Sequence, residues 1–259
     1  MSDGALLTLR DVVVDFDGFK AVDGVNLTID KGELRFLIGP NGAGKTSLVD
    51  VITGLTKPSE GEITFDGQPL AGVSAAKRVR AGIGRSFQTP TVFESLTVVE
   101  NLDLAETYRF GLRRMLRRRK GVSDGVTATL ERIGLGEQSH RPAGVLSHGQ
   151  KQWLEIGMLL VQQPKLVLLD EPVAGMSGSE RQATGELLEE LAEDHTVVVI
   201  EHDMAFLRRF ARSVTVLHEG RILSEGSVDY VQGDPKVREV YLGRSRDERS
   251  GAVTEEATS

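Results

Sequence analysis

The sequence predicts an α/β fold in which a mostly parallel sheet carries an N-terminal antiparallel β layer and an inserted α-helical subdomain. The apolar runs at 166–169 and 197–200 are continuous rather than alternating, which is typical of strands buried on both faces of a parallel sheet. Helical segments separate the strands along the chain, and this alternation favours parallel pairing. From 95 to 162 the spacing is helical and β-branched runs are few, which predicts the insert.

The N-terminal elements begin with two strands. Residues 6–16 are rich in Leu and Val, and residues 25–30 alternate apolar and polar side chains with the period of two that half-buried strands show. Residues 32–39 run apolar into a glycine-rich turn, and residues 45–55 follow with apolar side chains on one helical face. A further strand is expected within 61–70, which contains an Asp-Gly turn signal.

The C-terminal elements continue the alternation. Residues 165–172 form a short apolar strand, and residues 179–194 form a helix for which Ser179 is the candidate N-cap. Residues 195–203 are expected to form another buried strand. Residues 214–226 are expected to form a hairpin, because an acidic residue and a glycine stand at its centre.

These elements predict a single domain over 1–243. Its core is expected to comprise residues 1–88 and 165–243, and its helical subdomain residues 89–164. The remaining residues, 244–259, are polar and have few apolar anchors, so we expect them to form a disordered tail.

Composition excludes several classes of function. The chain has 259 residues, no cysteine and five scattered histidines, so disulfides, thiolate nucleophiles and Cys-type zinc sites are excluded. No apolar run approaches the roughly 20 residues that a membrane-spanning helix needs, and the N-terminus does not resemble a secretory signal. We therefore expect a cytoplasmic chain. The net charge of −7 disfavours nucleic acid as a partner.

A glycine-rich loop lies between the strand at 32–39 and the helix at 45–55. Its sequence, GPNGAGKT, fits the pattern G-x-x-x-x-G-K-[ST] of P-loop nucleotide-binding proteins. Backbone N–H groups of such a loop bind phosphates, its lysine reaches the terminal phosphates, and its hydroxyl binds Mg²⁺. An ordinary glycine-rich turn is the alternative. The candidate nucleotide-binding residues are Gly39, Asn41, Gly42, Gly44, Lys45, Thr46 and Ser47.

Two acidic residues follow the buried strand at 165–172. A P-loop needs a carboxylate at the end of another strand to hold the magnesium ion from its far side. Asp170 is the candidate for that role, and Glu171 is the candidate general base or water-orienting residue. The alternative is a strand that ends in two solvated acids.

Residues 146–150, Leu-Ser-His-Gly-Gln, resemble the LSGGQ signature motif of ABC-transporter ATPases. The resemblance covers 6–243 and implies the ABC ATPase fold, ATP hydrolysis, and ATP and Mg²⁺ as cofactors. It also implies that Ser147, Gly149 and Gln150 bind nucleotide.

Further elements match the same family. Phe16 resembles the aromatic residue that stacks on adenine, and residues 174–177 match the segment after the acidic pair. Gln88 is similar to the glutamine that joins the helical subdomain, with an implied catalytic and metal-binding role. His202 resembles the histidine that contacts the γ-phosphate. The alternatives are a core aromatic at Phe16 with Phe19 as the stacking residue, a surface amide at Gln88, and a structural histidine at 202.

Two positions depart from the family pattern. His148 replaces the usual second glycine of the signature, which places a side chain that titrates near neutral pH beside an expected phosphate. Ser177 stands where the family commonly has aspartate, which weakens any inference about communication between two sites.

The resemblance implies how such a chain works. Two ATPase domains close head to tail on two ATP molecules, and the second domain is either a related chain or another copy of this one. The dimer drives integral membrane permease subunits and, indirectly, a solute-binding protein, so the chain is expected at the cytoplasmic face of the inner or plasma membrane as a peripheral subunit. ABC ATPases of DNA repair or translation and simple P-loop kinases are the rival classes.

The segments 86–105, 146–157, 171–177 and 234–243 resemble the branched-chain amino-acid importer group, and within it they are most similar to an ATP-binding subunit of urea importers. Urea is therefore the expected cargo, and branched-chain or other amino acids are the alternative. The basic segment 109–120 is expected to be a solvated helix, with lipid headgroups or acidic loops of partners as alternatives.

Overall fold

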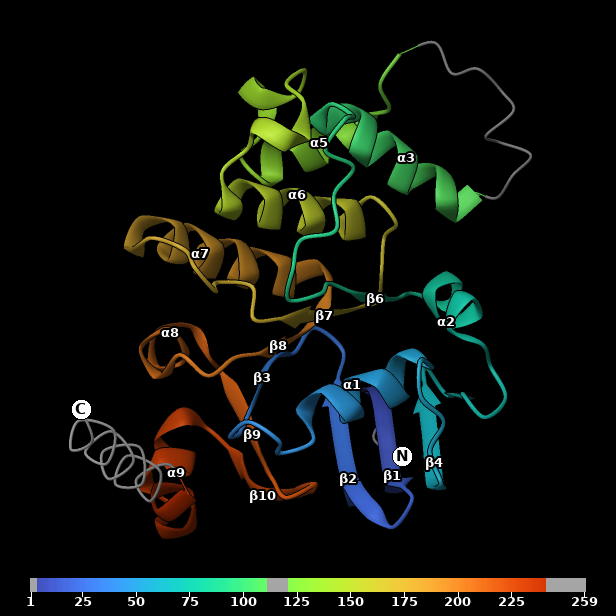
Figure 1. Cartoon of the computed structure of the whole chain (residues 1–259), viewed down its shortest axis with the longest axis vertical. Coiled ribbons are helices and arrows are strands. Elements are labelled where there is room, and N and C mark those ends of the chain that lie inside the picture. Colours follow the sequence, from blue (N-terminus) through green and yellow to red (C-terminus); the bar gives the residue numbers. More distant parts are fainter. Residues whose placement is uncertain (1–3, 111–120, 241–259) are drawn as a thin grey trace, which may run out of the picture.

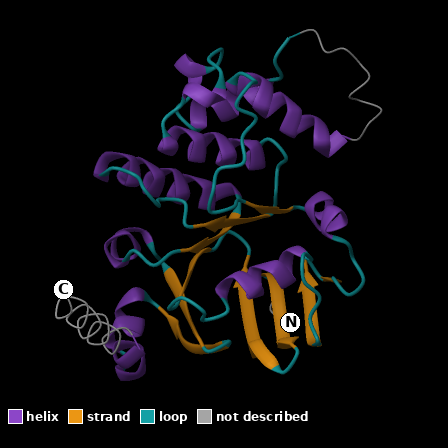
Figure 2. Cartoon of the chain, viewed as in Figure 1, coloured by secondary structure: helices purple, strands orange, loops and turns teal. Residues whose placement is uncertain are grey.

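The computed structural model describes residues 4–110 and 121–240, and its architecture confirms the predicted α/β fold (Figure 1). The strands form a four-stranded antiparallel sheet in the order β2-β1-β4-β5 and a six-stranded sheet in the order β10-β9-β3-β8-β7-β6. Figure 2 shows helices gathered at the end of the molecule that lies away from the antiparallel strands.

The antiparallel sheet is built by the N-terminal part of the chain, as predicted. Strand β1 (Ala5–Phe16) pairs with β2 (Phe19–Asp30) on one side and with β4 (Glu60–Phe65) on the other, and β5 (Gln68–Pro69) follows at the edge. In β2 the apolar side chains alternate with exposed polar ones from Val25 onward. The turn between β4 and β5 has positive φ at both of its residues, 47° and 76°, which suits the Asp-Gly pair found there.

The six-stranded sheet is parallel from β6 to β9, and β10 pairs with β9 in the antiparallel direction. Strands β3, β7 and β8 are buried at every residue, and the apolar runs of β7 and β8 predict this burial. The six strands are β3 (Leu34–Ile38), β6 (Ile83–Arg85), β7 (Leu166–Asp170), β8 (Thr196–Ile200), β9 (Ser213–His218) and β10 (Arg221–Gly226).

Helices form the predicted insert between β6 and β7. The helices of the described residues are α1 (Lys45–Thr53), α2 (Ala75–Ala81), α3 (Val98–Phe110), α5 (Asp124–Arg132), α6 (His148–Leu160), α7 (Gly178–Asp194), α8 (Met204–Phe210) and α9 (Val228–Gly233), with short 3₁₀ turns at Gly136–Gln138 and Ala143–Val145. Sequence reasoning missed the short helices α8 and α9, which flank the last hairpin, and α2, which precedes β6.

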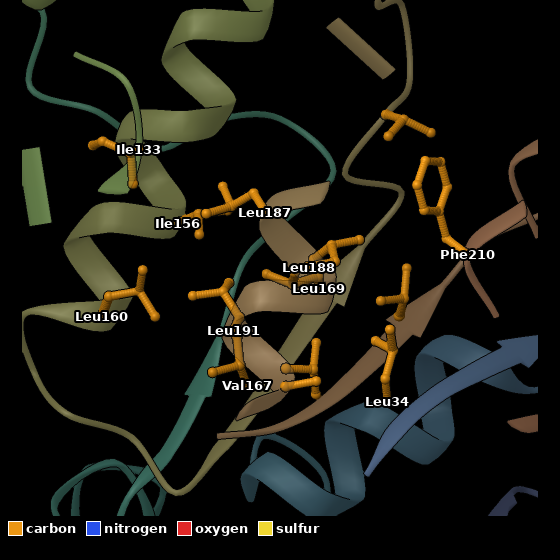
Figure 3. Packing of buried hydrophobic residues seen from close by; sticks show 14 of the residues in the cluster. Leu34, Ile133, Ile156, Leu160, Val167, Leu169, Leu187, Leu188, Leu191 and Phe210 are labelled. Carbon is orange, nitrogen blue, oxygen red and sulfur yellow. The ribbon is translucent and has the colours of Figure 1, made fainter. Parts of the chain in front are cut away.

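The large sheet separates two hydrophobic cores, and β7 shows how. Val167 and Leu169 point toward the leucines of α7, next to apolar residues of α6 (Figure 3). Leu166 and Leu168 point the other way, into a core shared with α1 and the antiparallel sheet. Full burial of each such side chain contributes roughly 1.5–3 kcal/mol, so both faces hold the sheet in place.

The start of α7 corrects one prediction. The N-cap is Ser177 rather than Ser179: the Ser177 hydroxyl accepts the N–H of Glu180, and the Glu180 carboxylate accepts the N–H of Ser177. Both serines have an acidic or amide residue three positions later, so the sequence pattern of a capping box fits either. The extended backbone at Ser177 (ψ 164°) decides between them.

The predicted strand at 195–203 also ends earlier than expected, because the chain leaves the sheet after Ile200. The hairpin prediction is confirmed, with its turn at Glu219 and Gly220.

The division into core and helical subdomain stays a prediction. The tail 244–259 and residues 111–120 of the basic segment lie outside the described residues. Within the described ranges, no helix has both the length and the apolar character needed to cross a membrane.

Candidate functional site

One pocket gathers most of the predicted site residues. It has a volume of about 260 Å³ and lies where the loop after β3 meets the ends of β7 and β8. The carboxyl ends of parallel strands are where ligands bind in α/β folds. The pocket is lined by Phe19, Ala21, Asn41, Gly42, Ala43, Gly44, Lys45, Thr46, Ser47, Gln88, Asp170, Glu171 and Ile200.

Two glycines near the ends of the loop from 39 to 46 leave no space for a side chain. Gly44 is the N-cap of α1 with φ 99°, and a Cβ added to it would lie 2.2 Å from the carbonyl oxygen of Ala21. A Cβ on Gly39 would lie equally close to the carbonyl oxygen of Leu217. The helix therefore begins without a capping side chain, and the N-terminus of a helix attracts anions.

Gly44→Ala is expected to lower the free energy of unfolding by about 3 kcal/mol, because the new Cβ meets a backbone carbonyl at a strained φ. Urea denaturation of both proteins measures the change. Gly72→Ala is the matched control: its φ is 70°, but no atom lies within 4 Å of the added Cβ. We expect a loss of about 1 kcal/mol there from the positive φ alone. Equal losses at the two positions would contradict the close packing at Gly44.

Lys45 is the first residue of α1, and its ammonium group lies over the loop that precedes it. The Nζ donates hydrogen bonds to the carbonyl oxygens of Gly39 at 2.8 Å and Pro40 at 3.1 Å. The positive charge is thus held beside the first-turn N–H groups of α1. Both features attract the same ligand, a polyanion such as a nucleotide phosphate chain.

Asp170 is the buried carboxylate of the site. It is the last residue of β7, its N–H donates to the Ser86 hydroxyl at 3.2 Å, and Nη2 of Arg85 lies 3.7 Å from its Oδ2. Burial raises the pKa of Asp170 and Arg85 opposes that rise, while the neighbouring Glu171 adds to it. A nearby metal cation favours the charged form of a carboxylate, so a buried carboxylate such as Asp170 is a suitable metal ligand.

Sequence reasoning missed Arg85. Its guanidinium is also ion-paired with Asp50 of α1, so one arginine links the helix after the glycine loop to the strand that carries Asp170. In the sequence the only signal is an arginine that follows Ile83 and Gly84, which form the buried part of β6. In the structure its guanidinium also lies over the ring of the exposed Phe87.

Glu171 lies in the pocket, and His202 lies beside it. Oε1 of Glu171 is 3.2 Å from Nδ1 of His202, and the backbone at Glu171 has a positive φ of 49°. His202 itself does not line the pocket, and its side chain is 64% exposed. Glu201 is buried, burial raises its pKa, and its carboxylate accepts the N–H groups of Val173, His202 and Asp203. The segment that carries His202 is thereby fixed against the end of β7.

The structure distinguishes the two aromatic candidates for stacking on a base by their position relative to the pocket. Phe16 and Phe19 pair across the turn between β1 and β2, and both are more than half exposed. Phe19 lines the pocket, whereas Phe16 does not. Gln88 lines the pocket from the loop after β6. The role of Phe16 in stacking on a base stays a prediction, and the geometry favours its rival.

The signature residues lie apart from this pocket, at the N-terminus of α6. Ser147 caps the helix, and Gln150 completes a capping box with it. The Ser147 hydroxyl also lies 3.4 Å from Oε1 of Glu180, and a Cβ on Gly149 would lie 2.6 Å from the same oxygen. Residues 147–150 therefore do not line the pocket that the glycine loop of their own chain forms.

One of the two positions that depart from the family pattern lies against the segment that precedes the other. The ring of His148 lies against Gly175, where an added Cβ would be 3.5 Å from Cδ2. Ser177 follows two residues later as the cap of α7. Ser177 thus supplies the capping oxygen that aspartate would supply, because both residue types are good N-caps.

The donor set of the pocket fits magnesium. Thr46, Gln88 and Asp170 offer a hydroxyl, an amide oxygen and a carboxylate, and oxygen ligands are those that Mg²⁺ prefers. Across residues 4–110 and 121–240, no cluster of three or more His, Asp or Glu side chains could hold a metal by itself. Magnesium typically needs only one or two carboxylates together with substrate phosphates. This pocket meets that requirement.

Comparison with known proteins agrees with the geometry. The ABC transporter family profile matches residues 22–174. The chain is 36% identical over 251 residues to the high-affinity branched-chain amino acid transport ATP-binding protein LivG of Escherichia coli K12, covering 93% of this chain and 98% of that protein. It is 33% identical over 251 residues to the corresponding protein BraF of Pseudomonas aeruginosa, with the same coverage.

Solved structures are also similar. The ADP conformation of an ATP-binding cassette of an ABC transporter superposes with a TM-score of 0.82 at 33% identity, over 92% of this chain and 99% of that one. A dimeric, post-hydrolysis ATP-binding cassette bound to ADP and Pi superposes with a TM-score of 0.72 at 25% identity, over 86% of this chain and 99% of that one.

Proposed function

The chain belongs to the ABC transporter family, in its branched-chain amino-acid (LivG-like) group of ATP-binding proteins, and we propose that it powers the import of branched-chain amino acids. ABC ATPases of this family hydrolyse ATP to drive transport, and they work as dimers with membrane permease subunits. The observation that carries the ATP-hydrolysing part of the proposal is the pocket that joins the glycine loop to Gln88, Asp170 and Glu171.

The cargo proposal replaces the expectation of urea. The relatives described above are named for branched-chain amino-acid transport, and nearly their whole length is covered by this chain. The expectation of urea has no such support, so the alternative cargo fits better. We also propose a solute-binding protein as an indirect partner and a peripheral position at the cytoplasmic face of the membrane, because the permease lies in that membrane.

The polar residues of the glycine loop and of the strand ends have proposed roles in ATP hydrolysis. The N–H groups from Gly42 to Ser47 and the ammonium of Lys45 bind the phosphates of ATP. Thr46, Gln88 and Asp170 would hold a magnesium ion, which would neutralise phosphate charge during hydrolysis. Glu171 orients the attacking water and accepts its proton, and His202, 3.2 Å from Glu171, keeps that carboxylate in place and contacts the terminal phosphate.

The position of the signature residues away from their own pocket favours a head-to-tail dimer. Ser147, Gly149 and Gln150 lie at the N-terminus of α6, outside the pocket of their own chain, and we assign them to the pocket of a second ATPase. The N-terminus of α6 then faces phosphate in the same way as the N-terminus of α1. The partner is a related ATPase chain or a second copy of this one.

Uptake measurements test the cargo. Cells that lack this chain are expected to lose uptake of labelled leucine and to keep uptake of labelled urea, and expression of the unmodified chain should restore leucine uptake. Loss of urea uptake with leucine uptake intact would reverse the assignment and return urea as the cargo.

A further inference from the structure

Glu155 is a buried carboxylate that the proposed mechanism does not use. It lies two turns into α6, the helix that begins after Ser147, and only 5% of its surface is exposed. Glutamate is rarely buried to this extent without a partner. Burial raises the pKa of Glu155, and hydrogen bonds from the backbone of Thr91 and Phe87 act against that rise. The partners of this side chain therefore belong to one loop.

That loop is the one that carries Gln88. Oε1 of Glu155 accepts the N–H of Thr91 at 3.2 Å, although Glu155 and Thr91 are 64 positions apart in the sequence. Thr91 lies three residues after Gln88. The loop has no regular secondary structure between β6 and α3. Its backbone is hydrogen-bonded to other segments at its two ends, at Ser86 and at residues 94–96, and Glu155 holds the part between them. A second buried side chain, Asn101 of α3, holds its far end through the N–H and carbonyl of Phe93.

We propose that Glu155 is a positioning residue for ATP hydrolysis, because it fastens the loop of Gln88 to the helix that presents Ser147. The position of Gln88 beside Asp170 then depends on where α6 lies, and α6 is the helix that meets the phosphates of the second ATPase. This inference rests on the proposed function, since it uses the roles assigned to Gln88 and Ser147. It goes beyond that function by naming the contact that links the two sites within one chain.

The test compares Glu155→Leu, Glu155→Gln and the unmodified chain. Leucine removes both acceptor oxygens, and glutamine keeps one neutral acceptor. The magnesium concentration for half-maximal ATP hydrolysis is expected to rise about tenfold in Glu155→Leu, because Gln88 is displaced from the metal. It should rise only about threefold in Glu155→Gln, since a neutral hydrogen bond is roughly half as strong as a charge-assisted one. ATP affinity measured without magnesium should be unchanged, because Glu155 does not line the pocket.

Hydrogen–deuterium exchange of residues 86–92 gives a second readout that does not depend on activity. Exchange is expected to accelerate in Glu155→Leu and less so in Glu155→Gln. Glu106→Leu is the matched control: Glu106 is also buried, lies on α3, and accepts the Ser123 hydroxyl at 2.8 Å. We expect it to change neither the loop exchange nor the magnesium requirement.

An unchanged magnesium requirement or unchanged loop exchange in Glu155→Leu would overturn the inference. Equal effects in Glu106→Leu would reduce Glu155 to a general packing role and overturn it too. If Glu155→Leu fails to fold, Glu155→Gln decides by the same two measurements. Failure of the unmodified chain to bind ATP at all would instead refute the proposed function, so the two failures are distinguishable.

Discussion

Lys45→Ala is expected to weaken ATP binding at least about a hundredfold and to abolish hydrolysis. The ammonium group is held over the loop by Gly39 and Pro40, where it would meet the terminal phosphates. Removing one member of a buried, hydrogen-bonded charge pair costs roughly 2–5 kcal/mol, and each 1.4 kcal/mol is a factor of about ten in affinity. Equilibrium binding of a fluorescent ATP analogue and release of phosphate measure the two effects.

Lys57→Ala is the control for the loss of one positive charge. Lys57 is exposed shortly after the end of α1 and does not line the pocket. We expect it to bind ATP as the unmodified chain does. Full ATPase activity in Lys45→Ala would refute the assignment of the glycine loop as the phosphate site.

Glu171→Gln is expected to lower the turnover number by about a hundred- to ten-thousand-fold while leaving ATP binding intact, because an amide cannot accept the proton of the attacking water. The variant should accumulate with ATP bound. Since the closed dimer is held together by ATP that is not hydrolysed, size-exclusion chromatography with ATP and magnesium is expected to show a dimer.

The control for this variant is Glu62→Gln, which makes the same chemical change at an exposed position of β4. Turnover there should be unchanged. A Glu171→Gln variant that stays monomeric with ATP would count against a head-to-tail dimer of two copies of this chain and would leave a related ATPase chain as the partner. A variant that keeps full turnover would remove Glu171 from the proposed chemistry.

Much of the fold follows from local pattern. Strands β7 and β8 are short, apolar and continuous, and such segments have few options other than the middle of a parallel sheet. The glycine loop was predictable for a similar reason, because its spacing encodes both a backbone shape and a charge. The N-cap of α7 was not predictable, since Ser177 and Ser179 satisfy the same capping rule and only the backbone path distinguishes them.

The rest of the site depends on contacts between segments far apart in the sequence. Arg85 reaches Asp50 across 35 positions, and Glu155 reaches Thr91 across 64. Neither pair has a motif, because the partner is set by how the elements pack. The choice between Phe16 and Phe19 has the same origin: the two face each other across a turn, and only the pocket shows that Phe19 borders it.

The central claim is that the glycine loop and Asp170 bind one magnesium nucleotide between them. A crystal structure of the Glu171→Gln variant grown with ATP and magnesium tests this most directly. We expect the phosphates to contact the N–H groups of residues 42–47 and the metal to be ligated by Thr46 and held on its far side by Asp170. Nucleotide bound elsewhere, or a metal that approaches neither residue, would contradict the account.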